Sequence, residues 1–384
     1  MIGRRAATLE VLTPLLSFIG LGLPAGAIGV AWPYMRVSLE APLSGLGIVI
    51  AGWTAAYFVV STATGALSTR VRTPVLLMAA CATAGAGTLG FAVASNLVVL
   101  AAASLLVGVG SGLIDATVNA QVSLTRGVRF MGWLHASWAV GAALGPPVVV
   151  GSLRATGSWR GAFLAMAILF AGVGVLVGWP RGVVPAEAPG LQSAGQKATS
   201  NRRRLLILLV GVFLLGSGIE GATGDWSFTH LTSGRSLSAN TAGLSLSLFW
   251  ISLAAGRMGL GMLGHRLDAN RLLDVCLSTV LIGTLSFWLA PPLVSAFIAL
   301  PLLGLSVSVI FPLLLSLTPV RLGRGMTAHA VGYQLAAGTL GAGGFPAVIG
   351  VFLQVFGLRL LGPILTVLAI ALLMLHGLSR RVTP

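Results

Sequence analysis

Acidic residues are scarce in this chain. Only 8 of its 384 residues are Asp or Glu, and charged residues of either sign make up 8% of the sequence. Soluble domains carry a charge on about a quarter of their positions, so this shortage excludes an ordinary soluble protein. Cysteine is rarer still, and both cysteines, Cys81 and Cys276, lie in apolar segments. We interpret them as small core residues, which excludes a disulfide-rich or metal-binding scaffold.

Long polar segments are almost absent as well. The chain is filled by apolar runs, each long enough to cross about 30 Å of hydrocarbon as a helix of roughly 20 residues. The runs lack the alternating pattern of membrane barrel strands, so they predict helices. We therefore expect an all-α polytopic membrane protein. Its twelve predicted spans are 9–33, 43–67, 75–94, 97–121, 131–152, 160–179, 205–229, 240–263, 271–290, 293–316, 327–352 and 359–378.

One longer polar segment divides this pattern in two. It covers 181–204, contains Pro and Gly, and ends in the basic run Arg202-Arg203-Arg204. This composition is typical of a linker. We predict a bundle of six helices over 1–180 and a second, pseudo-symmetric bundle of six over 205–384. Duplicated halves of this kind are typical of secondary transporters, which hold a small substrate near the middle of the bilayer between the halves.

Basic residues are distributed unevenly along the chain. A net charge of +15 would suit a nucleic-acid-binding protein, but most Lys and Arg fall in segments on one side of the predicted membrane. Those on the other side are Arg36, Arg154, Arg160, Arg235 and Arg359. The positive-inside rule then predicts that both termini are cytoplasmic. We expect a monomer in a bacterial inner membrane. Its partners should be the lipid bilayer, a small-molecule substrate and protons, and we expect no binding of nucleic acid.

Acidic residues inside spans are candidates for function because a buried carboxylate costs about 2.5–3.5 kcal/mol on insertion scales. Span 4 carries Ser111, Asp115 and Asn119 at intervals of four residues, which puts them on one helix face. His135 should enter span 5 at a similar depth, where it could pair with Asp115. We interpret Asp115 and His135 as proton-coupling residues and Asn119 as a substrate contact. A static polar contact between the two helices is the alternative.

Span 7 combines acidic residues with glycine. Four glycines between positions 216 and 224 predict a discontinuous helix that lines a cavity. Glu220 lies near the middle of the span, and we interpret it as a proton-coupling and substrate-binding residue. Asp225 is a further candidate, about 140° round the helix from Glu220. Trp226 could stack on a sugar, although tryptophan at the membrane interface is the commoner explanation.

Two pairs of polar aromatic and amide residues are weaker candidates for substrate binding. Trp53 and Tyr57 share one face of span 2, and Tyr333 lies in span 11 with Gln334 beside it. Such side chains suit a sugar or another polar organic ligand. Helix packing explains them equally well.

Enzyme motifs fail on their context. Gly85-Ala-Gly87-Thr-Leu-Gly90 matches G-x-G-x-x-G, but it lies inside a predicted span with no preceding strand. The sequence has no H-E-x-x-H, G-x-S-x-G or P-loop pattern. We therefore expect no enzymatic activity and no cofactor or metal.

The loops after spans 2 and 8 resemble each other and, in degraded form, the G-x-L-x-D-R-x-G loop of the major facilitator superfamily. That family's Asp is replaced by Thr69 in the first loop and by His265 in the second. The matching residues, which the resemblance implies are gating residues, are Gly65, Arg70, Gly261 and Arg266. The lost Asp normally helps to latch the cytoplasmic gate, so the resemblance leaves open how this gate closes.

The motifs of spans 4, 5, 7 and 8 resemble the fucose:proton symporter-like branch of that superfamily. The matching runs are Gly110-Ser-Gly-Leu-Ile-Asp115-Ala-Thr-Val-Asn119, Trp133-Leu-His135, Gly218-Ile-Glu220-Gly-Ala-Thr-Gly-Asp225-Trp226 and Phe249-Trp250-Ile-Ser-Leu-Ala-Ala-Gly256-Arg257. The resemblance implies proton-coupled transport of a sugar or polyol by alternating access. Fucose itself is not implied, because the branch's fucose carriers have an acid within span 1, where this chain has only Glu10 near the end.

Two other functions stay open. Gly141-x-x-x-Gly145-Pro146 in span 5 partly resembles the signature of drug:proton antiporters, so an exporter of drugs or secondary metabolites is the main alternative. The symporter-like branch carries a similar run, however, so this motif discriminates poorly. A receptor or scaffold that transports nothing is the third possibility, although it would gain nothing from buried acids.

Overall fold

The computed structural model describes residues 2–68, 70–125, 128–178, 200–263 and 266–382. These ranges contain helices and turns but no strand. Within these ranges, twelve helical segments are long and apolar enough to cross a membrane, which confirms the predicted fold class. The chain forms two compact units, Met1–Ala188 and Pro189–Pro384. Most of the predicted linker over 181–204 lies outside the described residues, and the helix that follows it begins at Ser200.

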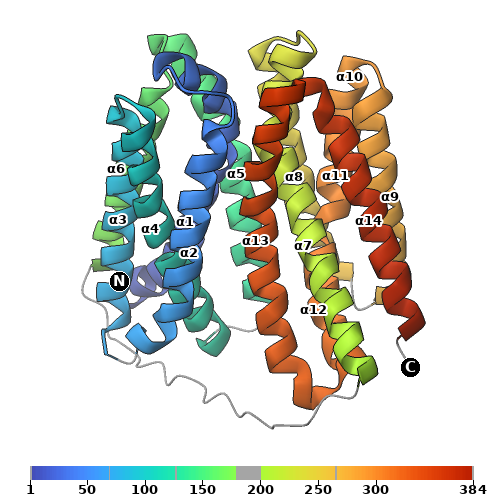
Figure 1. Ribbon diagram of the computed structural model, residues 1–384. Coiled ribbons are helices and arrows are strands. Elements are labelled where there is room, and N and C mark those ends of the chain that lie inside the picture. The colour runs from blue at the N-terminus through green and yellow to red at the C-terminus, as the bar shows by residue number, and fades with distance from the viewer. Residues whose placement is uncertain (1, 69, 126–127, 179–199, 264–265, 383–384) are drawn as a thin grey trace. The chain divides into compact units, whose positions relative to one another are not determined.

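Unit 1 has one helix for each of its membrane spans (Figure 1). They are α1 (Ile2–Ser38), α2 (Gly45–Ser68), α3 (Thr73–Val93), α4 (Leu97–Thr125), α5 (Val128–Thr156) and α6 (Arg160–Gly178). The main packing partners are α1 with α5, α2 with α4, and α3 with both α4 and α6. Helix α4 therefore has neighbours on two sides, and its polar face lies along α2.

Glycines bring these helices together backbone to backbone. A Cβ atom at Gly26 would lie 1.9 Å from the Ala142 carbonyl oxygen, and one at Gly141 would lie 2.1 Å from the Ile19 carbonyl oxygen. Only a residue without a side chain allows helices to approach this closely. The Gly141-x-x-x-Gly145 motif is therefore part of the contact between α5 and α1, which explains its spacing without reference to any substrate.

Unit 2 repeats this packing: α7 lies along α13, as Figure 1 shows, α8 lies along α11, and α9 along α14. Its helices are α7 (Ser200–Thr229), α8 (Ala239–Leu263), α9 (Ala269–Leu289), α10 (Pro292–Val294), α11 (Leu300–Ser308), α12 (Ile310–Leu322), α13 (Arg324–Phe356) and α14 (Leu361–Val382). Two π-helical turns, η1 (His230–Gly234) and η3 (Ser295–Ala299), and the 3-10 turn η4 (Leu358–Leu360) complete the unit.

The predicted break in the seventh span is wrong. Helix α7 continues through all four glycines, and two of them are packing positions against α13. A Cβ atom at Gly221 would lie 2.4 Å from the Ala342 carbonyl oxygen, and one at Gly218 would lie 2.7 Å from the Phe345 ring. The glycines thus make room for a neighbouring helix, and the contact with that helix offsets their intrinsic cost within α7.

The interruption occurs in the tenth span instead. This span, Pro292–Leu322, is divided into α10, η3, α11 and α12, with Val309 between the last two helices. Pro312 lacks the N–H that would bond to the Ser308 carbonyl, and Pro301 likewise cannot bond to Phe297. The missing N–H groups of Pro301 and Pro312 therefore accompany the interruption of the tenth span, whereas the glycines of α7 provide the contact with α13.

Candidate functional site

The centre of the candidate site in unit 1 is the carboxyl group of Asp115 on α4. The Tyr57 hydroxyl on α2 donates a hydrogen bond of 2.7 Å to its Oδ2 atom. The Asn119 amide, one turn further along α4, donates a hydrogen bond of 3.0 Å to its Oδ1 atom. We call these three residues the Asp115 cluster. Both carboxylate oxygens thus have a neutral donor, one from the same helix and one from the neighbouring helix.

Two glycines of α4 explain why Tyr57 reaches Asp115. A Cβ atom at Gly108 would lie 2.3 Å from the Trp53 carbonyl oxygen, and one at Gly112 would lie 2.8 Å from the Tyr57 carbonyl oxygen. Positions 108, 112, 115 and 119 follow the helical repeat, so glycines and polar residues share one face of α4. The close approach of the two backbones sets the register that places Tyr57 opposite Asp115.

His135 has a different neighbour from the one predicted. Its ring packs edge-on against the Phe18 ring, with ring centroids 5.7 Å apart. Both hydrogen bonds that the structure gives to the Asp115 carboxylate come from Tyr57 and Asn119. The proposed Asp115–His135 pair is therefore not among the contacts described, and it stays a prediction.

The charge of Asp115 has no fixed counter-charge. In the described part of the chain, no ion pair joins this carboxylate to Arg, Lys or His. A tyrosine hydroxyl both donates and accepts hydrogen bonds, so Tyr57 can bind the carboxylate as a donor and the carboxylic acid as an acceptor. The cluster can thus keep its hydrogen bonds in either charge state.

Glu220 in unit 2 is neutralised by an arginine. Nη2 of Arg257 on α8 lies 3.3 Å from Oε1 of Glu220 on α7, and each side chain is 19% exposed. Glu220 is among the acids predicted from the sequence, whereas its partner Arg257 was not predicted. The available signal was that Arg257 is a basic residue within the eighth span, one helix away from an acid in the seventh. An intramembrane charge usually has an opposite charge nearby.

The two residues that follow in α7 differ from each other. Asp225 is half-buried, and no hydrogen bond or ion pair joins it to another residue within the ranges described. Trp226 is fully buried, and its indole N–H donates a 2.9 Å hydrogen bond to the Pro346 carbonyl of α13. A sugar cannot stack on a ring that is already covered by protein. We therefore leave Trp226 out of the proposed site, and its predicted substrate contact stays untested.

The candidates on α13 point in different directions. Tyr333 is 59% exposed, whereas Gln334 is fully buried and accepts a 3.0 Å hydrogen bond from the Thr318 hydroxyl of α12. Gln334 therefore joins α13 to the broken tenth span. Neither the exposure of Tyr333 nor the hydrogen bond of Gln334 tests the predicted binding of substrate.

The predicted gating residues Gly65, Arg70, Gly261 and Arg266 are all exposed at helix ends. The replacements of the family's Asp, Thr69 and His265, lie outside the described residues. In the second of these loops, Asp268 caps α9 by accepting hydrogen bonds from the backbone N–H groups of Asn270 and Arg271. The Arg271 bond, followed by that of Asn270 and by nearby arginines, holds the pKa of Asp268 below its ordinary value. These caps stabilise the start of α9 and leave the gating role a prediction.

Comparison with known proteins identifies the family. The model of the Major Facilitator Superfamily matches residues 15–346. The chain belongs to this superfamily. A yeast relative from Saccharomyces cerevisiae, Bypass of stop codon protein 6, is 23% identical over 310 residues. That match covers 71% of this chain, which spans 62% of the length of the yeast protein.

Solved structures agree on the fold. The nucleoside transporter NupG superposes with a TM-score of 0.78 at 16% identity, covering 97% of this chain and 99% of NupG. The superfamily transporter FucP, in its outward conformation, superposes with a TM-score of 0.62 at 13% identity, covering 97% of this chain and 98% of FucP. At such identities the likeness shows the fold alone.

Proposed function

We propose that this superfamily transporter moves a small, polar, sugar-like organic solute across the membrane by alternating access, and that Asp115 couples the movement to protons. The observation that carries the proposal is the Asp115 cluster, a carboxylate inside a span that has two neutral hydrogen-bond donors and no described cation. The proposal also places the protein in a bacterial inner membrane as a monomer. Both termini are placed in the cytoplasm, because most Lys and Arg fall on that side of the predicted membrane.

A proton is the simplest counter-charge for Asp115. A buried carboxylate is costly in hydrocarbon, and binding one proton removes its charge without any other cation. When the carboxyl binds a proton, the Tyr57 hydroxyl can rotate and accept the new O–H. Protonation thus changes the charge of the cluster while its contacts persist. This behaviour suits a group whose proton is taken up and released once in each transport cycle.

Glu220 fits a different role in this scheme. Arg257 already neutralises it, so a proton on Glu220 would leave the guanidinium without its counter-charge. We propose that the Glu220–Arg257 pair orients a polar solute through its remaining donors and acceptors. The motif resemblance implies that Glu220 and His135 also take part in proton coupling. We keep this as a second, less favoured version of the proposal.

The test is transport by purified protein in proteoliposomes under an imposed pH gradient. We expect uptake of one member of a sugar and nucleoside panel, driven by acid outside, and no extrusion of hydrophobic drugs. Asp115→Asn should abolish accumulation against a gradient while leaving counterflow exchange largely intact, because the amide mimics the protonated acid. Accumulation that survives Asp115→Asn unchanged would overturn the coupling role.

The matched control is Glu187→Gln, which removes an acid outside the predicted spans and should leave accumulation unchanged. Drug extrusion in the same vesicles, with no sugar or nucleoside uptake, would favour the exporter alternative. The absence of transport for both panels in wild-type protein would contradict the proposed substrate class.

A further inference from the structure

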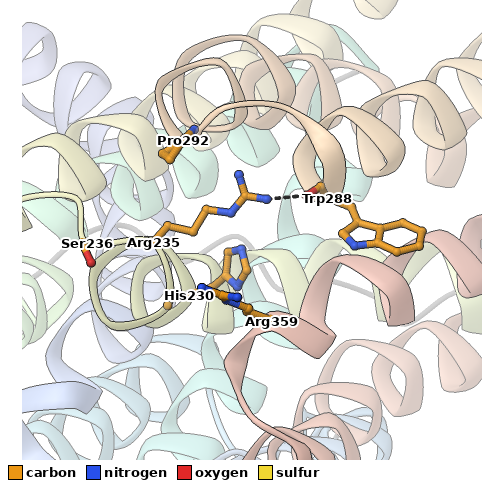
Figure 2. A pocket seen from close by; sticks show the side chains of 7 residues that line it. His230, Arg235, Ser236, Trp288, Pro292 and Arg359 are labelled. Atoms are coloured by element: carbon orange, nitrogen blue, oxygen red, sulfur yellow. Dashed lines mark hydrogen bonds between the residues drawn. The ribbon is translucent and has the colours of Figure 1, made fainter.

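Unit 2 contains a basic pocket that has no part in the proposed transport site. Its volume is about 460 Å³, within the range of pockets that bind small molecules. It lies at the end of unit 2 where α7 and α9 end and α14 begins. Figure 2 shows six of its lining residues: His230, Arg235, Ser236, Trp288, Pro292 and Arg359. Two of these residues are arginines and none is acidic.

Arg235 joins the segment after α7 to the end of α9 and to η3 by hydrogen bonds. Its Nη1 atom donates to the Ala290 carbonyl at 2.5 Å and to the Ser295 hydroxyl at 3.1 Å, and its Nη2 atom donates to the Trp288 carbonyl. Figure 2 shows the side chain extended towards Trp288. Trp288 and Ala290 lie at the end of α9, where carbonyl groups lack helical partners, so Arg235 is a cap for this helix.

Arg359 lacks such a contact. In unit 1, the arginine at the start of the sixth span, Arg160, donates a 2.9 Å hydrogen bond to the Ala92 carbonyl at the end of α3. Arg359 lies at the start of the twelfth span in the same way, but Arg235 already occupies the corresponding carbonyls of α9. Within the described residues, no hydrogen bond or ion pair is made by the exposed Arg359 guanidinium. Its donors therefore remain available to a ligand.

The two arginines also repel each other. Burial, and then the charge of Arg359, lower the pKa of Arg235. Two guanidinium charges beside one cavity, without a carboxylate among the lining residues, leave a site that favours an anion.

His230 adds an acceptor to this basic pocket. Its side chain is only 2% exposed, and Nδ1 lies 2.8 Å from the Leu358 carbonyl. A carbonyl oxygen can only accept, so Nδ1 carries the proton, and Nε2 of the neutral ring is an acceptor. Nε2 is buried and has no hydrogen-bond partner in the part of the chain that the structure describes. A buried polar atom without a partner calls for a ligand or a water.

We propose that this pocket binds a phosphate group, either of a soluble phosphate or of an anionic lipid headgroup. Arg359 binds the phosphate oxygens through its fork of N–H donors, and Arg235 contributes a second positive charge. Inorganic phosphate carries about one and a half negative charges near neutral pH and a lipid phosphodiester carries one, so both are attracted by the two arginines. Inorganic phosphate keeps a P–OH proton that can be donated to Nε2 of His230, whereas sulfate has no such proton. A lipid phosphodiester has no P–OH either, so for phosphatidylglycerol the donor to Nε2 is a hydroxyl of the glycerol headgroup.

The experiment uses the full chain in lipid-free detergent, with inorganic phosphate as the probe and thermal unfolding as the readout. We expect phosphate to raise the melting temperature of wild-type protein more than sulfate does at equal ionic strength. Arg359→Gln should weaken phosphate binding about tenfold or more, the loss typical of a charge-assisted hydrogen bond. Arg359→Lys, which keeps the charge and loses the fork, should fall between the two.

The matched control is Arg154→Gln, because Arg154 is also exposed and lies on the same predicted side of the membrane but outside the pocket. This variant should bind phosphate like wild-type protein. A second arm measures melting in nanodiscs of phosphatidylglycerol or phosphatidylcholine. Stabilisation by phosphatidylglycerol that depends on Arg359 but not on Arg154, without an effect of free phosphate, identifies the lipid headgroup as the ligand.

Equal weakening by Arg359→Gln and Arg154→Gln would show nonspecific charge attraction and overturn the proposal. The proposal is also overturned if neither phosphate nor phosphatidylglycerol stabilises wild-type protein. If sulfate binds as well as phosphate, the role of His230 is wrong. None of these results bears on Asp115, because the pocket residues belong to unit 2 and take no part in the proposed coupling.

Discussion

The two units treat a buried acid in different ways. In unit 1, the carboxylate of Asp115 has hydrogen bonds from Tyr57 and Asn119, both of them neutral. In unit 2, the carboxylate of Glu220 lies 3.3 Å from a guanidinium nitrogen of Arg257. The packing around them is otherwise alike, because glycines bring α4 close to α2 and α7 close to α13.

Protonation of Asp115 therefore breaks no ion pair, whereas protonation of Glu220 has the additional free-energy cost of breaking its ion pair with Arg257. Neutral donors stabilise a carboxylate without fixing its protonation state, since a tyrosine hydroxyl can also accept a hydrogen bond from the protonated acid. An ion pair holds both of its groups in the charged form, because removal of one charge leaves the other without the charge that balances it. The position of an acid inside a span is therefore not enough to assign proton coupling. The residue that contacts the acid, a neutral donor or a cation, decides whether its charge can change.

Removal of Arg257 should have the largest effect on stability. Arg257→Gln leaves the Glu220 charge uncompensated, and breaking a buried pair costs about 3 kcal/mol or more. Asp115→Asn should cost far less, because it leaves no cation behind. Thermal unfolding of both variants in detergent measures the contrast. The double variant Glu220→Gln/Arg257→Gln should recover most of the loss, and equal stability of Arg257→Gln and Asp115→Asn would contradict the comparison.

Gly108→Ala should disturb the register between α2 and α4. Its new Cβ atom would lie 2.3 Å from the Trp53 carbonyl oxygen, so the helices must separate. We expect a loss of about 2 kcal/mol in unfolding free energy, typical of overpacking, together with weaker pH-driven uptake. Gly172→Ala on α6 is the control, because nothing lies within 4 Å of its Cβ position. Similar behaviour of the two variants would argue against a role for close packing in the cluster.

A smaller effect is expected from Tyr57→Phe, which removes the 2.7 Å hydrogen bond to Asp115 and nothing else. A hydrogen bond to a charged group contributes about 1.5 kcal/mol or more to stability. In an Asp115→Leu background the same substitution should cost almost nothing, since the acceptor is gone. This double-mutant cycle measures the coupling of the two side chains. Additive losses would show that Tyr57 acts independently of Asp115.

The smallest effect belongs to the helix caps, which also differ between the units. Asp268 caps α9 with its side chain, whereas Arg72 at the start of α3 makes no side-chain cap. Because the folded state lowers the pKa of Asp268, its contribution is complete above its unfolded pKa and is lost as the pH falls through the folded value.

Asp268→Ala should therefore lower the melting temperature slightly at neutral pH and have no effect at a pH well below 3.8, its ordinary pKa. Arg72→Ala should show no such pH dependence. A deficit of Asp268→Ala that persists unchanged in acid would mean that the carboxylate cap is not its cause.

Hydropathy alone predicted the twelve spans, because bilayer thickness dictates the length of an apolar helix whatever its neighbours are. The helical repeat also placed Asp115 and Asn119 on one face, and these residues are hydrogen-bonded to each other. The break in α7 was predicted wrongly because glycine weakens an isolated helix. In the folded protein, α13, Trp250 and Ile310 fill the space beside these glycines. In the tenth span, Pro301 and Pro312 each remove a backbone donor where the helix is interrupted, but Pro24 and Pro346 lie inside continuous helices, so proline alone does not locate a break.

The sequence by itself determined the spans, the two repeated halves and the identity of the acids that lie in the membrane. The tertiary structure decided which side chain meets which acid. Tyr57 and Asp115 are separated by 58 positions, and Glu220 and Arg257 by 37. The reason is physical: periodicity along a chain specifies the face of a helix, but the contact between two helices depends on their relative depth and rotation, which close packing at glycine sets only in the folded protein.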